Sequence, residues 1–412
     1  MITIDHARKR VAAALEEIDR LKQSEFPYIH PCNALELLAE RFKQQQSMLE
    51  KLLPDASPEV TKNACSASLY ELYVYVPILG FILRSTNVRN AFEAYAPLMR
   101  LARSFLGDDT KLIMSSEWEF SPFVYRAIEG LKDFVLIGLP APESANPLLI
   151  PLAGHELGHS VWVKNKCSEI FDYRIEDGVL KELKDNKWKE YSSLYPHYRK
   201  EDLTNLLAIN TWRPAYTYAK FQAEEIFCDF FGLRLFAESY LHAFTYLLSP
   251  GLTGPRSVRY PNMIRRVSHI MDAANEMKIT VPPGFESGFV TGTEPEDPLS
   301  KLLVSIADTI SASLTPDLKK LVKEYASATA ITLRDHEKVV NICADFKDRI
   351  APTSESQSLT DLSNAGWICM LDPDLWKKVP QIKPEERDRV LKDLMLKSME
   401  VSEFYERLRK SL

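Results

Sequence analysis

Two histidines four residues apart stand in the string His155-Glu156-Leu157-Gly158-His159. Residues at this spacing on an α-helix face the same way, so both imidazoles can reach one metal ion while Glu156 lies beside it. A catalytic zinc ion takes about three protein ligands and keeps one position for water. It lowers the pKa of that water toward about 7. We therefore expect a zinc site in which Glu156 accepts the proton of the water as general base.

The alternative is an HExxH string that arose by chance on a surface helix. The surrounding residues argue against it, because Leu152, Leu157 and Val161 predict a partly buried helix from about 151 to 163. Gly158 lies between the two candidate ligands, where it permits a neighbouring backbone to approach closely. We interpret the string as a functional metal site.

The third zinc ligand is expected from a second helical segment, predicted to run from Tyr216 to about Leu248. Glu225 and Asp229 share one face of that helix, and Gly232 continues the face without a side chain that would hold two helices apart. The flanking residues are strongly apolar, and buried carboxylates need a cation or hydrogen-bond donors. We assign Glu225 as the third ligand and Asp229 as the acceptor of a free imidazole N–H.

Other interpretations of this segment remain open. Glu224 is a rival ligand, although its neighbour four residues on is Cys228 rather than a carboxylate. Glu224, Glu225 and Asp229 could also form a solvated stripe, or pair with Arg234 at ordinary helical spacing. His242 and His269 are weaker candidates, because a lone histidine on an apolar helix is usually structural.

The HExxH string followed by Glu225-x-x-x-Asp229 resembles the gluzincin metallopeptidases, in which the two histidines and a downstream Glu bind zinc. The separation, 225 − 159 = 66 residues, is closer to the neprilysin-like and CAAX-prenyl-peptidase-like branches than to the thermolysin-like branch. The CAAX-type branch often carries a His-Pro and a nearby Arg after its second helix. Here Tyr260-Pro261 followed by Arg265-Arg266 matches approximately, with Tyr in place of His. The resemblance covers about 134–267.

The resemblance implies a zinc-dependent peptidase that acts on a protein or peptide substrate. Glu156 would serve as general base and later as proton donor. Tyr260 could donate its phenolic O–H to the developing oxyanion, and Arg259 or Arg266 could add positive charge. The alternative for these three is that they pack and solvate a turn. Two other functions remain open: a zinc hydrolase of a non-peptide substrate, and a regulatory or sensor protein with a vestigial metallopeptidase module.

The expected fold is mainly α (α+β), with a zincin-like metallopeptidase core that contains a small sheet. Helical spacing dominates before about 107, whereas Phe134-Val135-Leu136-Ile137-Gly138 reads as a strand whose edge could pair with an extended peptide. A polar stretch, 167–196, has weak periodicity and predicts a solvated excursion. The expected regions are a helical N-terminal part (1–107), the catalytic core (108–280) and a helical C-terminal part (281–412).

Composition narrows the class of protein. The chain has 412 residues and a net charge of -6, and no stripe of Lys and Arg interleaved with aromatics, so nucleic acid is not expected as a partner. The six scattered cysteines and the lack of a secretory signal predict a cytoplasmic protein. The strongest apolar run, from Leu72 to Leu83, contains Pro77 and Gly80 and falls short of the about 20 residues that span a bilayer. We expect a buried helix there and no membrane span. The oligomeric state is not readable from the sequence.

Overall fold

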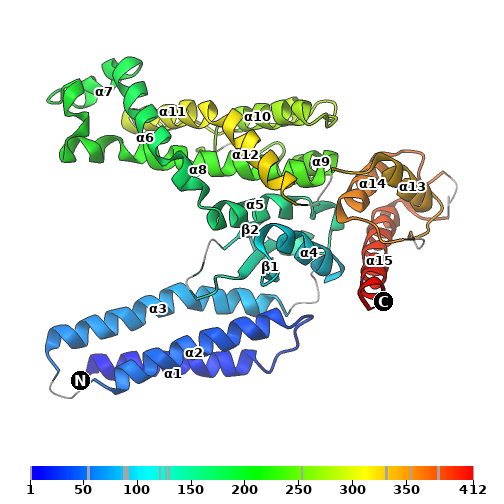
Figure 1. Cartoon of the computed structure of the whole chain (residues 1–412), viewed down its shortest axis with the longest axis horizontal. Coiled ribbons are helices and arrows are strands. Elements are labelled where there is room, and N and C mark those ends of the chain that lie inside the picture. The colour runs from blue at the N-terminus through cyan, green and yellow to red at the C-terminus, as the bar shows by residue number, and fades with distance from the viewer. Residues whose placement is uncertain are drawn as a thin grey trace. The chain divides into compact units, whose positions relative to one another are not determined.

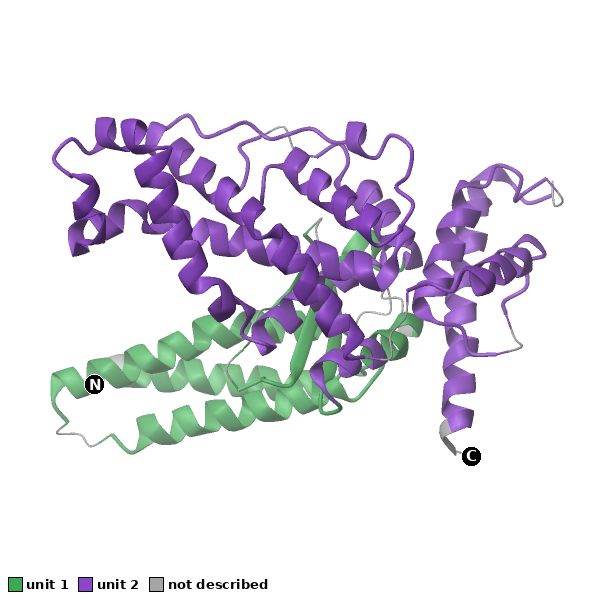
Figure 2. Ribbon diagram, turned by 45° about the horizontal axis from the view of Figure 1, so that its top comes forward, with its two compact units in different colours: residues 1–99, 108–145 green, residues 100–107, 146–412 purple. Residues whose placement is uncertain are grey.

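The computed structural model describes residues 2–52, 56–86, 92–119, 122–125, 128, 130–251, 254–329, 333–352, 355–377 and 381–411. The chain is mainly helical, with 71% helix and 5% strand, which agrees with the predicted mainly α class with a small sheet. It divides into two compact units, coloured separately in Figure 2. Unit 1 comprises Met1–Met99 and Asp108–Ala145, and unit 2 comprises Arg100–Gly107 and Asn146–Leu412.

Three long helices lie side by side in unit 1 (Figure 1). Their inward faces carry apolar residues at helical spacing, among them Val11, Ile18, Leu35 and Phe42, all fully buried. The helical spacing that dominates the sequence before about 107 thus does form helices here. The helices are α1 (Ile2–Leu21), α2 (His30–Glu50) and α3 (Pro58–Arg84), followed by η1 (Phe92–Ala94) and α4 (Tyr95–Leu106), which passes from unit 1 into unit 2.

The helix expected over Leu72 to Leu83 is confirmed, but it is only partly buried. Helix α3 has 27 residues, continues through Pro77, and is long and apolar enough to cross a membrane, a property that core helices of soluble proteins share. Only 33% of its most apolar window is buried. Tyr70 and Tyr73 are 67% and 75% exposed. One side of this run is buried, and the other is exposed at Tyr73, Val76 and Leu83; the buried residues are Tyr75, Ile78, Leu79, Phe81 and Ile82.

The small sheet of unit 1 has three described strands in the order β1-β3-β2. β3 pairs in parallel with β1, from Lys111 opposite Phe134 onward, and antiparallel with β2, where Phe123 lies opposite Gly138. The strand predicted at 134–138 is confirmed, but it is the central strand, so the free edge expected for a substrate peptide is wrong. The strands are β1 (Lys111–Glu117), β2 (Phe123–Val124) and β3 (Phe134–Pro140), and η2 (Ala141–Glu143) follows.

Unit 2 is built around one long helix, α8 (Leu206–Phe236). Every residue from Gln222 to Leu233 is buried, because neighbouring helices pack on all sides of this stretch. Those that contact α8 are α5 (Leu152–Lys164), α6 (Cys167–Asp185), α9 (Glu238–Leu248), α10 (Met263–Glu276), α11 (Pro298–Ser313), α12 (Thr315–Ser327) and α14 (Leu359–Leu371). The remaining elements are η3 (Pro147–Leu149), α7 (Trp188–Leu194), η4 (Lys200–Thr204), η5 (Glu286–Gly288), α13 (His336–Lys347) and α15 (Pro384–Ser411).

Two predictions for unit 2 need correction. The single helix expected from Tyr216 to Leu248 is two helices, because Ala237 has a positive φ of 51° and turns the chain between α8 and α9. The solvated excursion expected over 167–196 is wrong, since α6 and α7 occupy most of it. An apolar stripe at every fourth residue buries α6, and the many charged residues around the stripe conceal it in the sequence. The stripe consists of Cys167, Phe171, Ile175, Val179 and Leu183.

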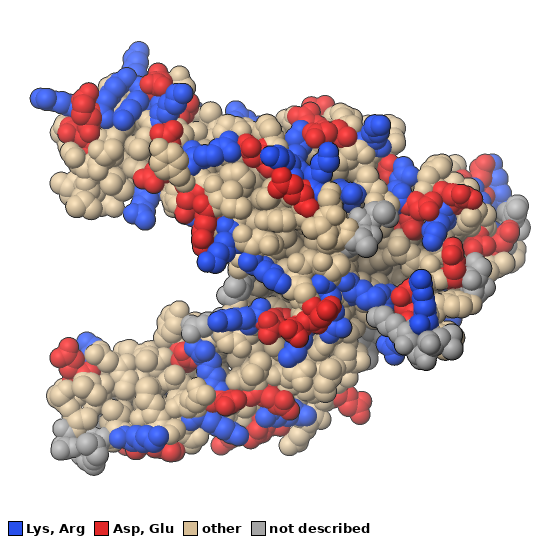
Figure 3. Space-filling model, in the orientation of Figure 1, with Lys and Arg blue, Asp and Glu red and all other residues tan. Residues whose placement is uncertain are grey.

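Charged side chains of both signs are interspersed on the face shown in Figure 3. Neither Lys and Arg nor Asp and Glu gather into a continuous stripe on this face.

Candidate metal centre

Helices α5 and α8 approach each other closely because glycines lie at their contact. A Cβ atom on Gly154 would lie 3.2 Å from the Cα of Gly232, and one on Gly158 would lie 3.0 Å from the Cα of Cys228. These pairs run in opposite directions along the two helices, so the helices pack antiparallel. The close approach predicted from Gly158 and Gly232 is confirmed, and it brings the HExxH residues against the acidic stretch of α8.

Each imidazole of the HExxH pair binds a carboxylate through Nδ1. His155 Nδ1 lies 2.9 Å from Asp229 Oδ1, and His159 Nδ1 lies 2.7 Å from Glu224 Oε1. All four side chains are buried. A carboxylate at Nδ1 favours a proton on that nitrogen, so in a neutral ring the lone pair is on Nε2. Both rings are thereby prepared to bind a cation through Nε2.

Glu225 faces both Nε2 atoms. Its Oε2 lies 3.3 Å from His155 Nε2, and its Oε1 lies 3.7 Å from His159 Nε2. Oε2 is buried and has no hydrogen-bond partner among the described residues. Lone pairs on two nitrogens and a carboxylate thus converge at one place away from water, an arrangement that a cation stabilises. The donor set of two imidazoles and one carboxylate fits a zinc ion.

Without a metal ion, a proton on His155 stabilises the convergence of the two imidazoles and the Glu225 carboxylate. Burial lowers the pKa of His155, but the hydrogen bond to Asp229 and the nearby carboxylate of Glu225 outweigh burial and raise the pKa to about 10. Burial raises the pKa of Glu225, yet the imidazoles of His155 and His159 close to it outweigh burial and hold that pKa below its usual value. A proton and a metal ion therefore compete for the same position between His155 and Glu225.

Cys228 offers a second possible third ligand. His155, His159 and Cys228 are all buried, and one donor atom from each lies within 4.8 Å of the others, so this group could hold a metal ion. Metal binding through sulfur requires a thiolate. Burial raises the pKa of Cys228 well above its usual value, and the nearby carboxylates, Glu225 foremost, raise it further. Glu225 is already ionised, and its carboxylate faces both Nε2 atoms with one oxygen that accepts no hydrogen bond within the described part of the chain, so Glu225 is the better candidate.

Asp229 accepts hydrogen bonds from three side chains. Besides His155, Arg266 binds it through Nε at 2.6 Å and Nη2 at 2.7 Å, and the Tyr240 hydroxyl donates to it at 2.8 Å. Burial raises the pKa of Asp229, but the charge of Arg266 outweighs this and keeps the carboxyl ionised. Asp229 therefore lies where the sequence predicts, on the free N–H of a histidine, and Arg266 neutralises its charge.

Glu156 is buried next to the two histidines. Burial raises its pKa, and the nearby imidazoles of His155 and His159 partly oppose that rise. A carboxylate with a raised pKa is a stronger base than an exposed one, which suits it to accept a proton near neutral pH.

Tyr260 belongs to the same neighbourhood. The guanidinium of Arg266 lies 5.2 Å from the centre of its ring. The charge of Glu225, followed by burial, raises the pKa of Tyr260 to about 12, so its hydroxyl stays protonated and can donate. Arg259 is exposed and lies over the ring of Phe221, at 4.9 Å.

The structure brings His155, His159, Glu225 and Asp229 together as expected from the sequence. The solvated stripe is excluded, because Glu224, Glu225 and Asp229 are each no more than 5% exposed. The role of Glu224 as partner of His159 and that of Tyr240 were missed. Nothing in the sequence indicated the contact between Glu224 and His159, because the residue four positions after Glu224 is Cys228 rather than a second carboxylate. His242 stacks on Trp367, and His269 lies on α10.

No known family model, curated protein or solved structure matches this chain. What the centre can do is therefore argued from its own chemistry.

Substituting Gly232 with Ala is expected to destabilise the chain. Ala normally stabilises a helix relative to Gly by about 1 kcal/mol. Here the added Cβ would lie 2.5 Å from the ring of Tyr240 and 3.1 Å from the backbone nitrogen of His155. We expect the free energy of unfolding in urea to fall by about 1–3 kcal/mol. Gly80→Ala is the control, because its Cβ would meet only the flexible end of Arg84; a stabilising effect at both positions would contradict the close packing.

Proposed function

We propose that this chain is a zinc-dependent metallopeptidase of the gluzincin type with a zincin-like core. The observation that carries the proposal is the convergence of His155 Nε2, His159 Nε2 and the carboxylate of Glu225 at one buried place, where Oε2 of Glu225 accepts no hydrogen bond from any residue that the structure describes. Glu156 beside this place distinguishes it from a structural zinc site, because a metal that only stabilises a fold needs no general base.

His155, His159 and Glu225 would hold the ion, with the imidazoles oriented by Asp229 and Glu224. When bound, zinc lowers the pKa of water and polarises a substrate carbonyl. Glu156 accepts a proton from the attacking water and later delivers it to the departing amine, so that one peptide bond and one water yield a carboxylate and an amine.

Tyr260 donates its hydroxyl to the carbonyl oxygen as that oxygen gains negative charge. The raised pKa of Tyr260 supports this role, because the group remains a donor throughout the neutral range. Arg266 is committed to Asp229 through two hydrogen bonds, so we assign it to orientation of His155 rather than to contact with substrate.

Metal removal tests the proposal. The purified chain is expected to contain about one zinc ion, to cleave members of a mixed peptide library, to lose cleavage in 1,10-phenanthroline and to regain it when zinc is added back. The melting temperature should fall on removal, because a ligand that binds only the folded state stabilises it. Metal content is measured by mass spectrometry and cleavage by peptide sequencing of the products.

The same measurements separate the alternatives. Zinc without cleavage of any peptide, together with hydrolysis of small esters, would favour a hydrolase of a non-peptide substrate. Zinc without hydrolysis of either substrate would favour a sensor with a vestigial module. Absence of zinc from a folded chain would contradict all three.

A further inference from the structure

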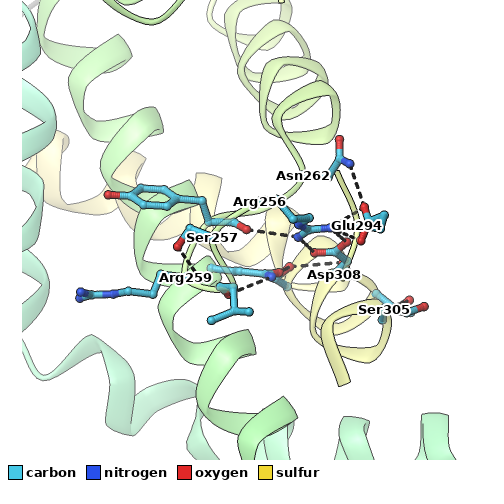
Figure 4. A network of polar contacts seen from close by, with 12 residues as sticks. Arg256, Ser257, Arg259, Asn262, Glu294, Ser305 and Asp308 are labelled. Carbon is cyan, nitrogen blue, oxygen red and sulfur yellow. Dashed lines mark hydrogen bonds and ion pairs between the residues drawn. The ribbon is translucent and has the colours of Figure 1, made fainter. Parts of the chain in front are cut away.

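The loop that carries Tyr260 is held by a buried arginine. Arg256 binds Asp308 of α11 through two hydrogen bonds, Nη1 to Oδ2 and Nη2 to Oδ1, each of 2.7 Å. The side chains of Arg256 and Asp308 are only 6% and 7% exposed. The same Nη2 donates to the backbone carbonyl of Tyr260 at 3.3 Å, and Nη1 donates to Glu294 at 3.1 Å. Figure 4 shows this network, from which Arg259 points away.

Further contacts tie the loop to its surroundings. The amide of Arg256 donates to the carbonyl of Thr293 at 3.1 Å, and Thr293 donates to Gly254 at 3.0 Å. Gln222 is fully buried on α8, three residues before Glu225. Its amide lies 3.5 Å from the carbonyl of Val258, and its Oε1 accepts from Ser311 of α11 at 2.8 Å. Helix α11 therefore supports the loop through both Asp308 and Ser311.

Net stability is a poor explanation for such a buried pair. Removing two charges from water costs several kcal/mol per ion, and a buried ion pair often stabilises a fold no more than apolar residues of the same volume. What the pair supplies is geometry, because the planar guanidinium binds the carboxylate with both Nη atoms while one of them also reaches the Tyr260 carbonyl. A lysine has the charge but not this shape.

We propose that Arg256, held by Asp308, is a positioning residue for Tyr260. It sets the backbone of Tyr260 while Arg266, fixed by Asp229, lies against the ring. The phenol is thereby kept at a defined place relative to Glu225 and the histidines. The expected effect of Arg256 on catalysis rests on the proposed function. Its expected effect on the order of the loop rests on the loop contacts alone.

Arg256→Lys tests the structural consequence without any substrate. We expect faster amide hydrogen exchange over 254–262, zinc content equal to wild type, and unchanged exchange in α5. Arg334→Lys is the matched control, because Arg334 binds Glu238 of α9 through two nitrogens in the same unit but does not contact this loop. It should leave exchange over 254–262 as in wild type. Unchanged exchange over 254–262 in Arg256→Lys would overturn the inference, whatever the catalytic activity.

A double-mutant cycle tests the catalytic consequence. Arg256→Lys is expected to lower kcat about 10- to 100-fold with little change in KM, because small displacements of a catalytic group act on the transition state. In a Tyr260→Phe background the same change should have almost no effect, because the group that Arg256 positions is gone. Equal losses in both backgrounds would overturn the inference. A wild-type chain that cleaves no peptide would instead count against the proposed function, and the exchange experiment would still decide the positioning.

Discussion

Glu225→Gln is expected to empty the metal site. The amide is neutral and nearly the same size, so it keeps the packing but removes the negative charge that faces both Nε2 atoms at 3.3 and 3.7 Å. Loss of an outer partner of a zinc ligand typically costs about 10- to 100-fold in metal affinity. Loss of the ligand itself should cost more, and we expect zinc content after dialysis to fall close to zero and peptide cleavage to disappear with it. Competition with a chromophoric chelator measures the affinity.

Two neighbours on α8 provide matched controls. Glu224→Gln weakens the hydrogen bond to His159 Nδ1, so zinc should bind about 10- to 100-fold less tightly yet remain detectable. Cys228→Ala removes the sulfur that lies within reach of both histidines and should leave zinc content unchanged. If Cys228→Ala empties the site and Glu225→Gln does not, the ligands are His155, His159 and Cys228, and our assignment is wrong.

Glu156→Gln is expected to abolish cleavage while the metal stays bound. A positioned general base contributes about 10²- to 10⁴-fold to rate, so kcat should fall by about 10³-fold with zinc content unchanged. Stability should not suffer. Burial raises the pKa of Glu156, which means that the fold disfavours its charged form, and the neutral amide removes that penalty. The melting temperature is therefore expected to equal or exceed that of wild type.

This combination separates a catalytic role from a structural one. A structural role for Glu156 predicts that loss of activity is accompanied by a lower melting temperature or by loss of zinc. Glu169→Gln, on the exposed side of α6, is the control for removal of one negative charge and should change neither activity nor stability. Full cleavage by Glu156→Gln would exclude Glu156 as the general base.

Helical spacing was sufficient to predict the inner part of the centre. His155 with His159 and Glu225 with Asp229 are each four apart, and this alone places each pair on one face. Spacing cannot decide which of two adjacent carboxylates faces the two Nε2 atoms and which faces an Nδ1 atom, because that depends on the rotation of α8 against α5. The contact of Glu224 with His159 Nδ1 therefore became apparent only in the structure.

The outer part of the centre could not be predicted. Arg266 and Asp229 are 37 residues apart, and Arg256 and Asp308 are 52 apart. No periodicity links such positions, and an arginine in a loop looks the same in the sequence whether it is solvated or buried. Only the packing of α10 and α11 around α8 brings these partners together.

The fold shows the same limit. Continuous amphipathic helices such as α1 and α2 follow from apolar spacing, whereas the turn at Ala237 has no sequence signal. Alanine is a strong helix former, and a positive φ at a non-glycine residue is normally unfavourable. The surrounding packing imposes that conformation. Likewise, the stripe along α6 is narrow, so charged neighbours mask it unless every fourth residue is examined.

The glycines where α5 meets α8 have a consequence for engineering. The five-residue HExxH string alone should not transfer the candidate metal centre to another helical scaffold, because an unrelated partner helix would lie too far away to contribute its carboxylate. A transferable version needs Gly154 and Gly158 on one helix and Gly232 on the other, with the two helices antiparallel and in the same register as in α5 and α8. An engineered protein based on this chain should therefore keep these three glycines together with the residues proposed to bind the metal.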